Sequence, residues 1–272
     1  MSSTLTEKSE GGGKSKSLLE HFTEYFTVEY ATTAAQKHEI YHIRFRVYCE
    51  EFEYEPIPKT LQNRELGEER DEFDDNSLHC LIRHRSGMAA GCVRLVTTDN
   101  RAEGGRLPLE KYCEKSLDRE FYDSLQLSRG SICEISRLAV DGAFRRRSGE
   151  ALTRFGEVEA MDCSQQEKRT FSLIAVAGFL AATALTDLQG TTNVFAMMEP
   201  FLPRLMKRSG IDFQRAGEDM NYHGIRAPYF ITTHSALEGM LPDLRDLYGE
   251  IREQIERDFV KIRQAGLSVP VD

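Results

Sequence analysis

The sequence predicts a mixed α/β (α+β) fold with a central, twisted, mixed sheet and helices on both of its faces. Strand-like segments in the first half are separated by short turns, whereas those in the second half are separated by helical segments. Hydrophobic residues make up 40% of the 272 residues, which is enough for a packed core. The expected order of strands and helices is β-α-β-β-β-α-β-α-β-β.

The first half is expected to form strands and one long helix. Residues 26–30 (FTVEY) predict a strand, and residues 34–51 predict a helix with an apolar stripe at Ile40, Ile43 and Val47. Residues 78–85 and 89–98 predict a hairpin that turns at Ser86-Gly87. A short helix near 117–125 and a strong strand at 132–140 follow.

The second half is expected to be richer in helices. Helical sequence extends to residue 188 and includes the apolar run 171–185, which is shorter than the roughly 20 residues of a membrane span. A strand at 194–198, a short helix at 200–209 and strands at 212–215 and 229–233 come next. Residues 241–262 carry one apolar face and predict a packing helix or an oligomer contact.

Composition excludes some classes of protein. The net charge is −9, whereas a general nucleic-acid binder needs a basic surface, so no nucleic-acid partner is expected. The six cysteines form no CxxC pair, which favours a reducing, cytoplasmic location over a disulfide framework. Residues 1–20 lack the apolar core of a signal peptide and predict a flexible tail.

Acidic residues are concentrated between residues 50 and 75. This stretch holds eleven Asp and Glu against three Lys and Arg, and such runs are usually solvated loops. The spacing of Asp71 and Asp74 also resembles a metal site. No His or third carboxylate stands at a defined ligand spacing, so neither a metal nor another cofactor is expected.

The strand at 132–140 carries charged residues among apolar ones. Alternation places Glu134 and Ser136 on one face and Arg137 on the other. Burying such groups is costly unless they are paired or serve a site. The sequence leaves two alternatives open: an ion-pair network with Arg94 or Arg44, or a functional site. Cys133 is expected to be structural, because no His accompanies it.

Several short motifs occur in an order that resembles the acyl-homoserine-lactone autoinducer synthases, a family with the GNAT acyltransferase fold. They are RFRVYCEEFEY with Arg44, Tyr48 and Tyr54, DEFDDNS with Asp71 and Asp74, GCVRLV with Arg94, and CEISRLAV with Glu134, Ser136 and Arg137. The segment 197–230 is more similar to a sister group, the N-acyl amino acid synthases or exosortase-associated acyltransferases. The resemblance covers residues 26–233 and implies a GNAT-like domain at 21–235, followed by a C-terminal helix and tail at 236–272.

The resemblance implies an acyltransferase that uses a thioester donor. Two departures from the autoinducer synthases favour an amino acid over S-adenosylmethionine as acceptor: Tyr54 replaces a Trp, and Val96-Thr97-Thr98 replaces a Pro-containing run. Glu134 is expected to be the general base, with Ser136 beside it. The acceptor is expected to be bound by Tyr48, Tyr54, Asp71 and Asp74, and its carboxylate by an arginine from the set Arg44, Arg94 and Arg137.

The donor is expected to bind at the end of the strand and the basic turn that follows. The resemblance implies that backbone N–H groups from Leu138 to Val140 stabilise the oxyanion. The turn FRRRSGE carries Arg145, Arg146, Arg147 and Gly149; it is either an ordinary surface run or a docking site for an acidic acyl carrier protein. The expected partners are therefore an acyl carrier protein, or coenzyme A in its place, and a small-molecule amino acid.

Two other functions stay open at this point. One is synthesis of an acyl-homoserine lactone from S-adenosylmethionine. The other is a GNAT-fold protein that binds an acyl or amino-acid ligand without turnover. Glu134 and the basic turn favour an enzyme over a binding protein.

Overall fold

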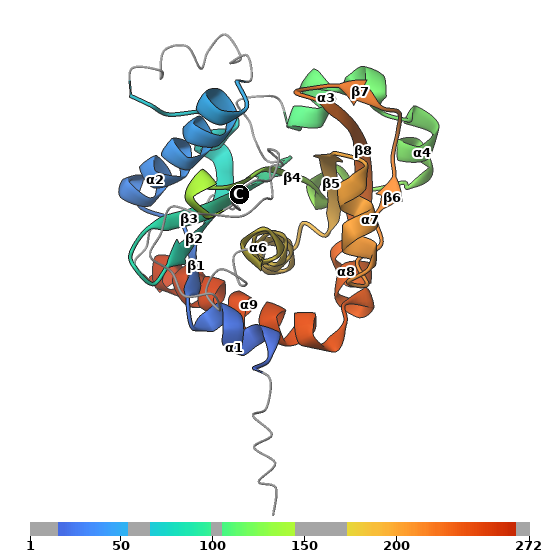
Figure 1. Cartoon of the computed structure of the whole chain (residues 1–272). Coiled ribbons are helices and arrows are strands. Elements are labelled where there is room, and N and C mark those ends of the chain that lie inside the picture. Colours follow the sequence, from blue (N-terminus) through green and yellow to red (C-terminus); the bar gives the residue numbers. More distant parts are fainter. Residues whose placement is uncertain (1–15, 54–65, 99–104, 145–172, 265–272) are drawn as a thin grey trace, which may run out of the picture.

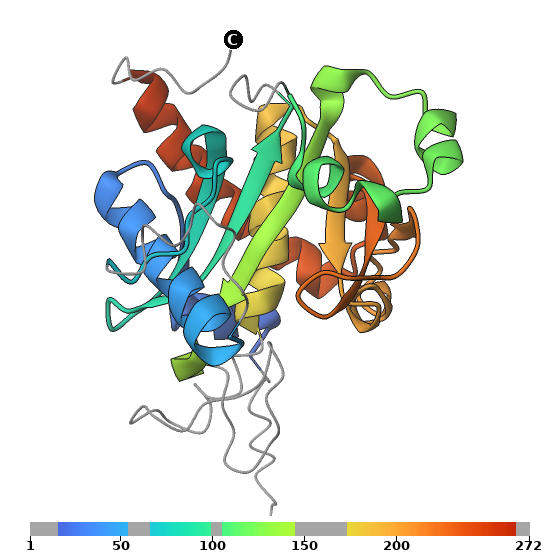
Figure 2. The same ribbon diagram turned by 90° about the horizontal axis from the view of Figure 1, so that it is seen from above.

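A computed structural model describes residues 16–53, 66–98, 105–144 and 173–264. Within them, eight strands form one sheet in the order β1-β2-β3-β4-β5-β8-β6, with β7 paired to β8 (Figures 1 and 2). The β4–β5 pair is parallel and the other pairs are antiparallel. The strands are β1 (Phe26–Tyr30), β2 (Ser77–His84), β3 (Ala89–Thr97), β4 (Ile132–Val140), β5 (Asn193–Met198), β6 (Gln214–Arg215), β7 (Met220–Asn221) and β8 (Ile225–Thr232).

Helices cover both faces of this sheet, as Figure 1 shows. On one face lie α2 (Ala34–Arg44) and the π-helix η1 (Phe45–Glu51), and on the other lie α1 (Leu18–Thr23), α6 (Leu173–Gln189) and α9 (Pro242–Gln264). Shorter helices flank β5 and β8, namely α3 (Pro108–Tyr112), α4 (Arg119–Ser124), α7 (Phe201–Lys207) and α8 (Thr233–Gly239). The predicted mixed α/β class is confirmed.

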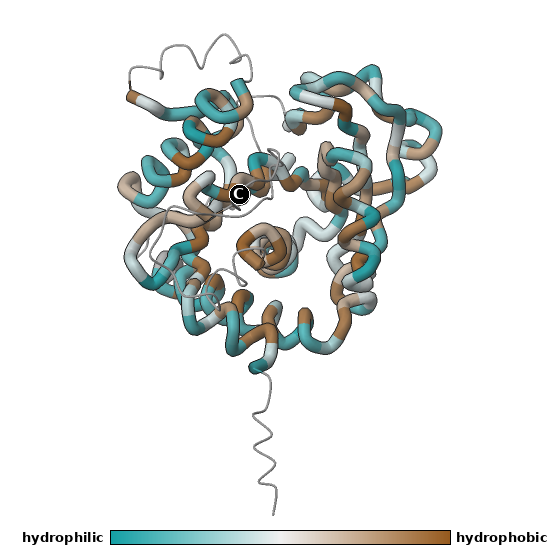
Figure 3. Tube along the Cα trace, viewed as in Figure 1, coloured by the Kyte–Doolittle hydropathy of each residue, from teal (hydrophilic) through white to brown (hydrophobic). Residues whose placement is uncertain are grey.

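Alternation along β2 and β3 divides the core between the two faces. Leu81 and Cys92 pack with α2, whereas Ile82 and Val93 pack with α6. Helix α6 is apolar on all sides (Figure 3), which is typical of a helix that is buried all round. Gly178 allows its close approach to β4, because a Cβ there would lie 2.4 Å from the side chain of Leu138.

The C-terminal helix α9 is a packing helix. Its apolar face is buried against α1, α6 and β1, and Tyr30 of β1 stacks on Phe259 with ring centroids 4.4 Å apart. The predicted packing role of this helix is confirmed. No described helix is long and apolar enough to cross a membrane.

The predicted helix at 34–51 is not one regular α-helix. The α-helix ends at Arg44 and continues as a π-helix, in which the Phe52 amide donates to the Val47 carbonyl oxygen at 3.1 Å. The wider turn rotates the following residues relative to a continuous α-helix. The strand β8 begins at Ile225, four residues earlier than the prediction of 229–233.

Candidate active site

A gap between β4 and β5 lies at the centre of the candidate site. The two strands pair only from Ile132 to Glu134 on β4 and from Asn193 to Phe195 on β5, although both continue further. From Ile135 onward the strands therefore separate. Side chains from both strands line two pockets at this point.

A β-bulge in β4 accompanies the separation. The register with β3 shifts by one residue between Cys92–Ala139 and Arg94–Ser136, and Arg137 has a φ of 54°, which is uncommon outside glycine. The bulge changes the alternation of side chains. Arg137 consequently faces the same side as Ser136, so the sequence-based placement of Arg137 on the opposite face is wrong.

The backbone of β4 beyond the bulge directs N–H groups into the gap. The Asp141 amide donates to the Ala90 carbonyl oxygen of the β3 side at 2.9 Å, and Ala139 pairs with Cys92. Because alternate residues of a strand point their N–H groups to opposite neighbours, those of Leu138 and Val140 point away from β3. Donors in this position can stabilise a developing oxyanion.

Two buried arginines and the partly buried Arg137 form an ion network with three buried carboxylates beside the gap. Arg44 binds Asp74 through two hydrogen bonds of 2.6 and 3.0 Å. Arg94 binds Asp71 at 2.6 Å and Asp74 at 2.9 Å. The remaining pairs join Arg137 to Glu69 and Asp71, and Arg44 to Glu69.

The three positive and three negative charges of this network balance, and Asp71 and Asp74 stay ionised because arginines lie beside them. Burial alone would raise the pKa of Asp74, but the charges of Arg44 and Arg94 hold it well below its usual value. Asp71 is likewise buried and its pKa is lowered. The two carboxylates thus belong to a buried ion-pair network rather than to a solvated loop. Both contact arginines of the network directly.

Glu134 lies at the closed end of the gap. It is 2% exposed, and its Oε2 accepts a hydrogen bond from the Leu109 amide at 2.7 Å. Burial raises the pKa of this carboxyl group to about 8. Its side chain lines the first pocket, so Glu134 combines access to a cavity with the pKa of an effective general base.

Two hydroxyl groups complete this part of the site. Ser136 Oγ accepts a hydrogen bond from Arg94 Nε at 3.1 Å, which leaves its hydrogen available for donation. Tyr48, on the π-helix, donates to the Leu138 carbonyl oxygen at 2.8 Å. Both residues line both pockets, and Tyr48, Glu134, Ser136 and Arg137 all line the first pocket.

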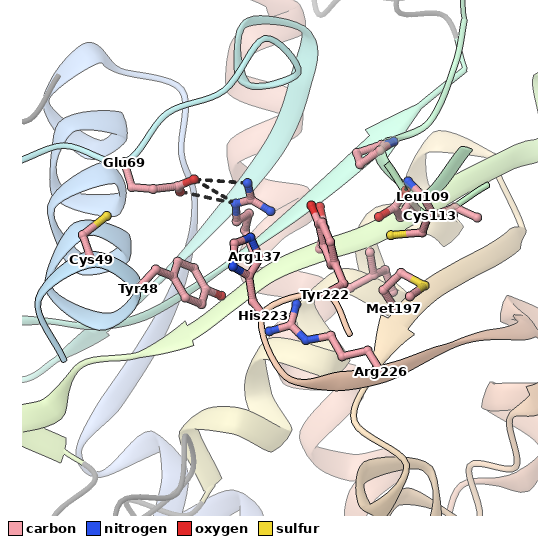
Figure 4. A pocket seen from close by; sticks show the side chains of 14 residues that line it. Tyr48, Cys49, Glu69, Leu109, Cys113, Arg137, Met197, Tyr222, His223 and Arg226 are labelled. Atoms are coloured by element: carbon pink, nitrogen blue, oxygen red, sulfur yellow. Dashed lines mark hydrogen bonds and ion pairs between the residues drawn. The ribbon is translucent and has the colours of Figure 1, made fainter. Parts of the chain in front are cut away.

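The structure adds three residues that the sequence analysis did not assign to the site. Tyr222, His223 and Arg226 line the first pocket from the β7–β8 hairpin (Figure 4). The guanidinium carbon of Arg226 lies 5.8 Å from the ring centroid of Tyr222. The sequence signal was an arginine just before the predicted strand at 229–233, which is easily interpreted as a loop residue.

Two cavities extend along the gap. The second pocket runs between β4 and β5 past Leu138, Met198 and Leu202. A more enclosed, largely apolar cavity lies beyond it. Ile135 and Phe179 line both, so these two side chains stand at the boundary between the two spaces.

Some predicted site residues lie outside the described residues. These are Tyr54, Arg145, Arg146, Arg147 and Gly149.

Comparisons with known proteins identify the domain. Residues 43–154 match a family model described as "Acetyltransferase (GNAT) domain". The chain carries a GNAT domain. The match includes the π-helix, the ion network and the whole of β4 with its bulge. The protein is therefore an acyltransferase, in agreement with the prediction. A comparison with curated protein sequences gives no match.

Solved structures agree on the fold of this GNAT acyltransferase. TofI, in complex with an inhibitor and MTA, is 18% identical, with a TM-score of 0.54 over 80% of this chain and 98% of that chain. BjaI, a coenzyme A-dependent acyl-homoserine lactone synthase, is 14% identical, with a TM-score of 0.52 over 84% and 90%. FeeM, an N-acyl amino acid synthase from uncultured soil microbes, is 10% identical, with a TM-score of 0.50 over 79% and 94%.

Proposed function

We propose that the enzyme transfers a fatty acyl group from an acyl carrier protein to the amine of an amino acid, forming an N-acyl amino acid. The observation that carries this proposal is the gap between β4 and β5 with Glu134 at its closed end. The gap opens on one side to a pocket that combines charged and apolar side chains and on the other to an apolar cavity. The first pocket suits an acceptor amine, and the apolar cavity suits the chain of a fatty acyl thioester.

The reaction is direct aminolysis of the thioester. Glu134, as the carboxylate, takes a proton from the amine while nitrogen bonds to the carbonyl carbon. The N–H groups of Leu138 and Val140 and the hydroxyl of Ser136 stabilise the oxyanion. As the oxyanion collapses, the C–S bond breaks and the thiolate takes the proton back from Glu134, which is ionised again for the next cycle.

The acyl chain is assigned to the apolar side of the gap. The second pocket is lined by Leu138, Phe179 and Met198 among others, and the cavity beyond it is walled mainly by apolar residues of α6, β5 and β8. Burying a methylene group stabilises binding by about 0.8 kcal/mol. A chain that reaches past Ile135 and Phe179 therefore gains affinity with each added carbon.

An acyl carrier protein is favoured as donor by the surface next to this pocket. Helix α7 contributes Leu202 to the pocket lining and carries Arg204, Lys207 and the adjacent Arg208. The exposed Phe201 and Leu205 lie on the same helix. A basic surface with apolar side chains suits an acidic carrier protein on a molecule whose own net charge is −9.

A second candidate function has a specific observation in its favour. Coenzyme A-dependent acyl-homoserine lactone synthases, BjaI with S-adenosylmethionine among them, share this fold. In that case the acceptor amine belongs to S-adenosylmethionine and the product is a lactone. The position of Glu134 in the gap serves either acceptor, and it argues against a protein that only binds its ligand.

One experiment separates these functions. Purified protein is incubated with palmitoyl-acyl carrier protein or palmitoyl-coenzyme A, and with the common amino acids or S-adenosylmethionine, and products are identified by mass spectrometry. The proposal expects N-palmitoyl amino acids, formed faster from the carrier protein. Lactone formation from S-adenosylmethionine would refute the acceptor assignment, and ligand binding without any product would refute the enzyme assignment.

A further inference from the structure

The arginines of the ion network are poorly suited to hold a substrate carboxylate. Arg44, Arg94 and Arg137 already bind protein carboxylates at hydrogen-bonding distance. Their three positive charges meet the three negative charges of Glu69, Asp71 and Asp74. A fourth carboxylate placed among them would be in excess, and burying an excess charge is costly.

Arg226 approaches the same pocket from the other side of the gap. It lies on β8, whereas the ion network is attached to α2, β3 and β4. Its side chain lines both the first and the second pocket. Figure 4 shows Arg226, Tyr222 and Arg137 projecting from different elements into the region that the first pocket occupies.

The electrostatic surroundings of Arg226 suit an anion. Burial lowers the pKa of its guanidinium group, and the charge of Arg137 acts in the same direction. A carboxylate bound beside Arg226 would offset the unfavourable effect of Arg137 on the charge of Arg226. Arginine presents two parallel N–H donors, which match the two oxygens of a carboxylate.

The chemistry of an α-amino acid requires its two ends to share one pocket. The amine and the carboxylate are attached to the same carbon, so the base that deprotonates the amine and the cation that binds the carboxylate must face the same cavity. Glu134 and Arg226 both line the first pocket. Cys113 and Met197 form an apolar part of the lining of this pocket. The side chain of the acceptor can lie against them.

We propose that Arg226 binds the carboxylate of the acceptor amino acid and so selects acceptors that carry an α-carboxylate beside the amine. This inference rests on the proposed function, because it requires an acceptor of that class. Arg137 lines the same pocket, but its charge is already matched by Glu69 and Asp71, so the carboxylate is assigned to Arg226.

The test compares Arg226→Gln with Arg226→Lys and with the wild type. Acceptors are glycine, L-leucine and L-tyrosine and their amides, with palmitoyl-acyl carrier protein as donor. Losing one partner of a buried charge pair lowers affinity about 30- to 10³-fold, so Arg226→Gln should raise the acceptor KM by that factor and leave the donor KM within about threefold. Arg226→Lys keeps the charge without the fork and should be intermediate. The preference of the wild type for acids over amides should disappear in Arg226→Gln.

Controls keep this test independent of folding and of turnover. Arg215→Gln on β6 removes an exposed arginine that binds Asp219 and should change neither KM. Calorimetric binding of L-leucine and L-leucinamide to the wild type and Arg226→Gln measures the same selectivity without turnover. Equal binding of acid and amide by the wild type overturns the inference, as does a rise in donor KM in place of acceptor KM.

The failure of this inference is distinguishable from failure of the proposed function. S-adenosylmethionine also carries an α-amine and a carboxylate. If the enzyme uses it in place of amino acids, the proposed acceptor is wrong, yet Arg226→Gln should still raise the KM for S-adenosylmethionine. If N-acyl amino acids form and Arg226→Gln leaves the acceptor KM unchanged, the proposed function stands and the assignment of Arg226 is overturned.

Discussion

Replacing Glu134 with Gln should abolish most of the activity and at the same time stabilise the fold at alkaline pH. Burial raises the pKa of this carboxyl group from its ordinary value of 4.5 to about 8. The folded state therefore binds the proton more tightly than the unfolded state. The stabilisation from protonated Glu134 is fully present below pH 4.5 and is lost as the pH rises through 8.

The size of both effects follows from this pKa. Across the interval from 4.5 to about 8, at 1.36 kcal/mol per pH unit, ionising Glu134 costs the fold up to about 5 kcal/mol. Gln cannot ionise, so the variant should unfold at higher denaturant concentration than the wild type at pH 9 and at a similar concentration at pH 5. Loss of a general base lowers turnover about 10²- to 10⁴-fold.

Chemical denaturation and steady-state kinetics between pH 5 and pH 9.5 measure these two effects. For the wild type, kcat/KM should rise steeply with pH up to about 8, because the base acts only when ionised, and less steeply above it, where only the acceptor amine is still losing its proton. Glu29→Gln is the matched control. Its carboxylate, on β1, has a pKa that burial tends to raise but that hydrogen bonds from Arg83 and Gln36 lower. This control should lose stability at neutral pH and keep its activity. A Glu134→Gln variant that is folded and fully active would refute the reasoning.

Two further outcomes are expected. Asp74→Asn removes the negative charge that the buried Arg44 and Arg94 share, and it should destabilise the protein by about 3 to 5 kcal/mol. Chemical denaturation measures this change in stability, and a change below about 1 kcal/mol would show that the network tolerates the loss. Phe179→Ala opens the boundary between the second pocket and the apolar cavity, so the variant should prefer longer acyl chains than the wild type. Competition among C8 to C18 donors measures this preference. An unchanged preference would show that the acyl chain does not pass Phe179.

Much of the fold could be predicted because its signals are local. Alternation and turn residues predicted the boundaries of β1, β2, β3 and β4 to within one residue. The apolar face of α9 predicted a packing helix. The π-helix after Arg44 and the bulge at Arg137 carry no such signal. Each inserts an extra residue into a regular repeat, and periodicity assumes that no residue is inserted.

Candidate site residues could be predicted from the sequence where they lie within motifs. They were harder to predict where tertiary contacts determine which side chains pair. Glu134 stood out as a carboxylate in an apolar strand. The buried ion network was foreseen as an alternative, but with Glu134 as its acid, whereas the direct partners of the arginines are Glu69, Asp71 and Asp74. Those acids come from a run that resembles a solvated loop. Only the folded chain shows that these three carboxylates are buried.

The short pairing between β4 and β5 has a mechanical consequence. Along the sheet, the strands before the gap and those after it are joined through three residue pairs. A thioester arm that bonded to the exposed edges of both strands would take the place of the missing ladder, so the sheet would be continuous only while the donor is present. Departure of the thiol would leave the gap open again, with the two sides of the sheet held together by the three pairs and by the apolar core that they share.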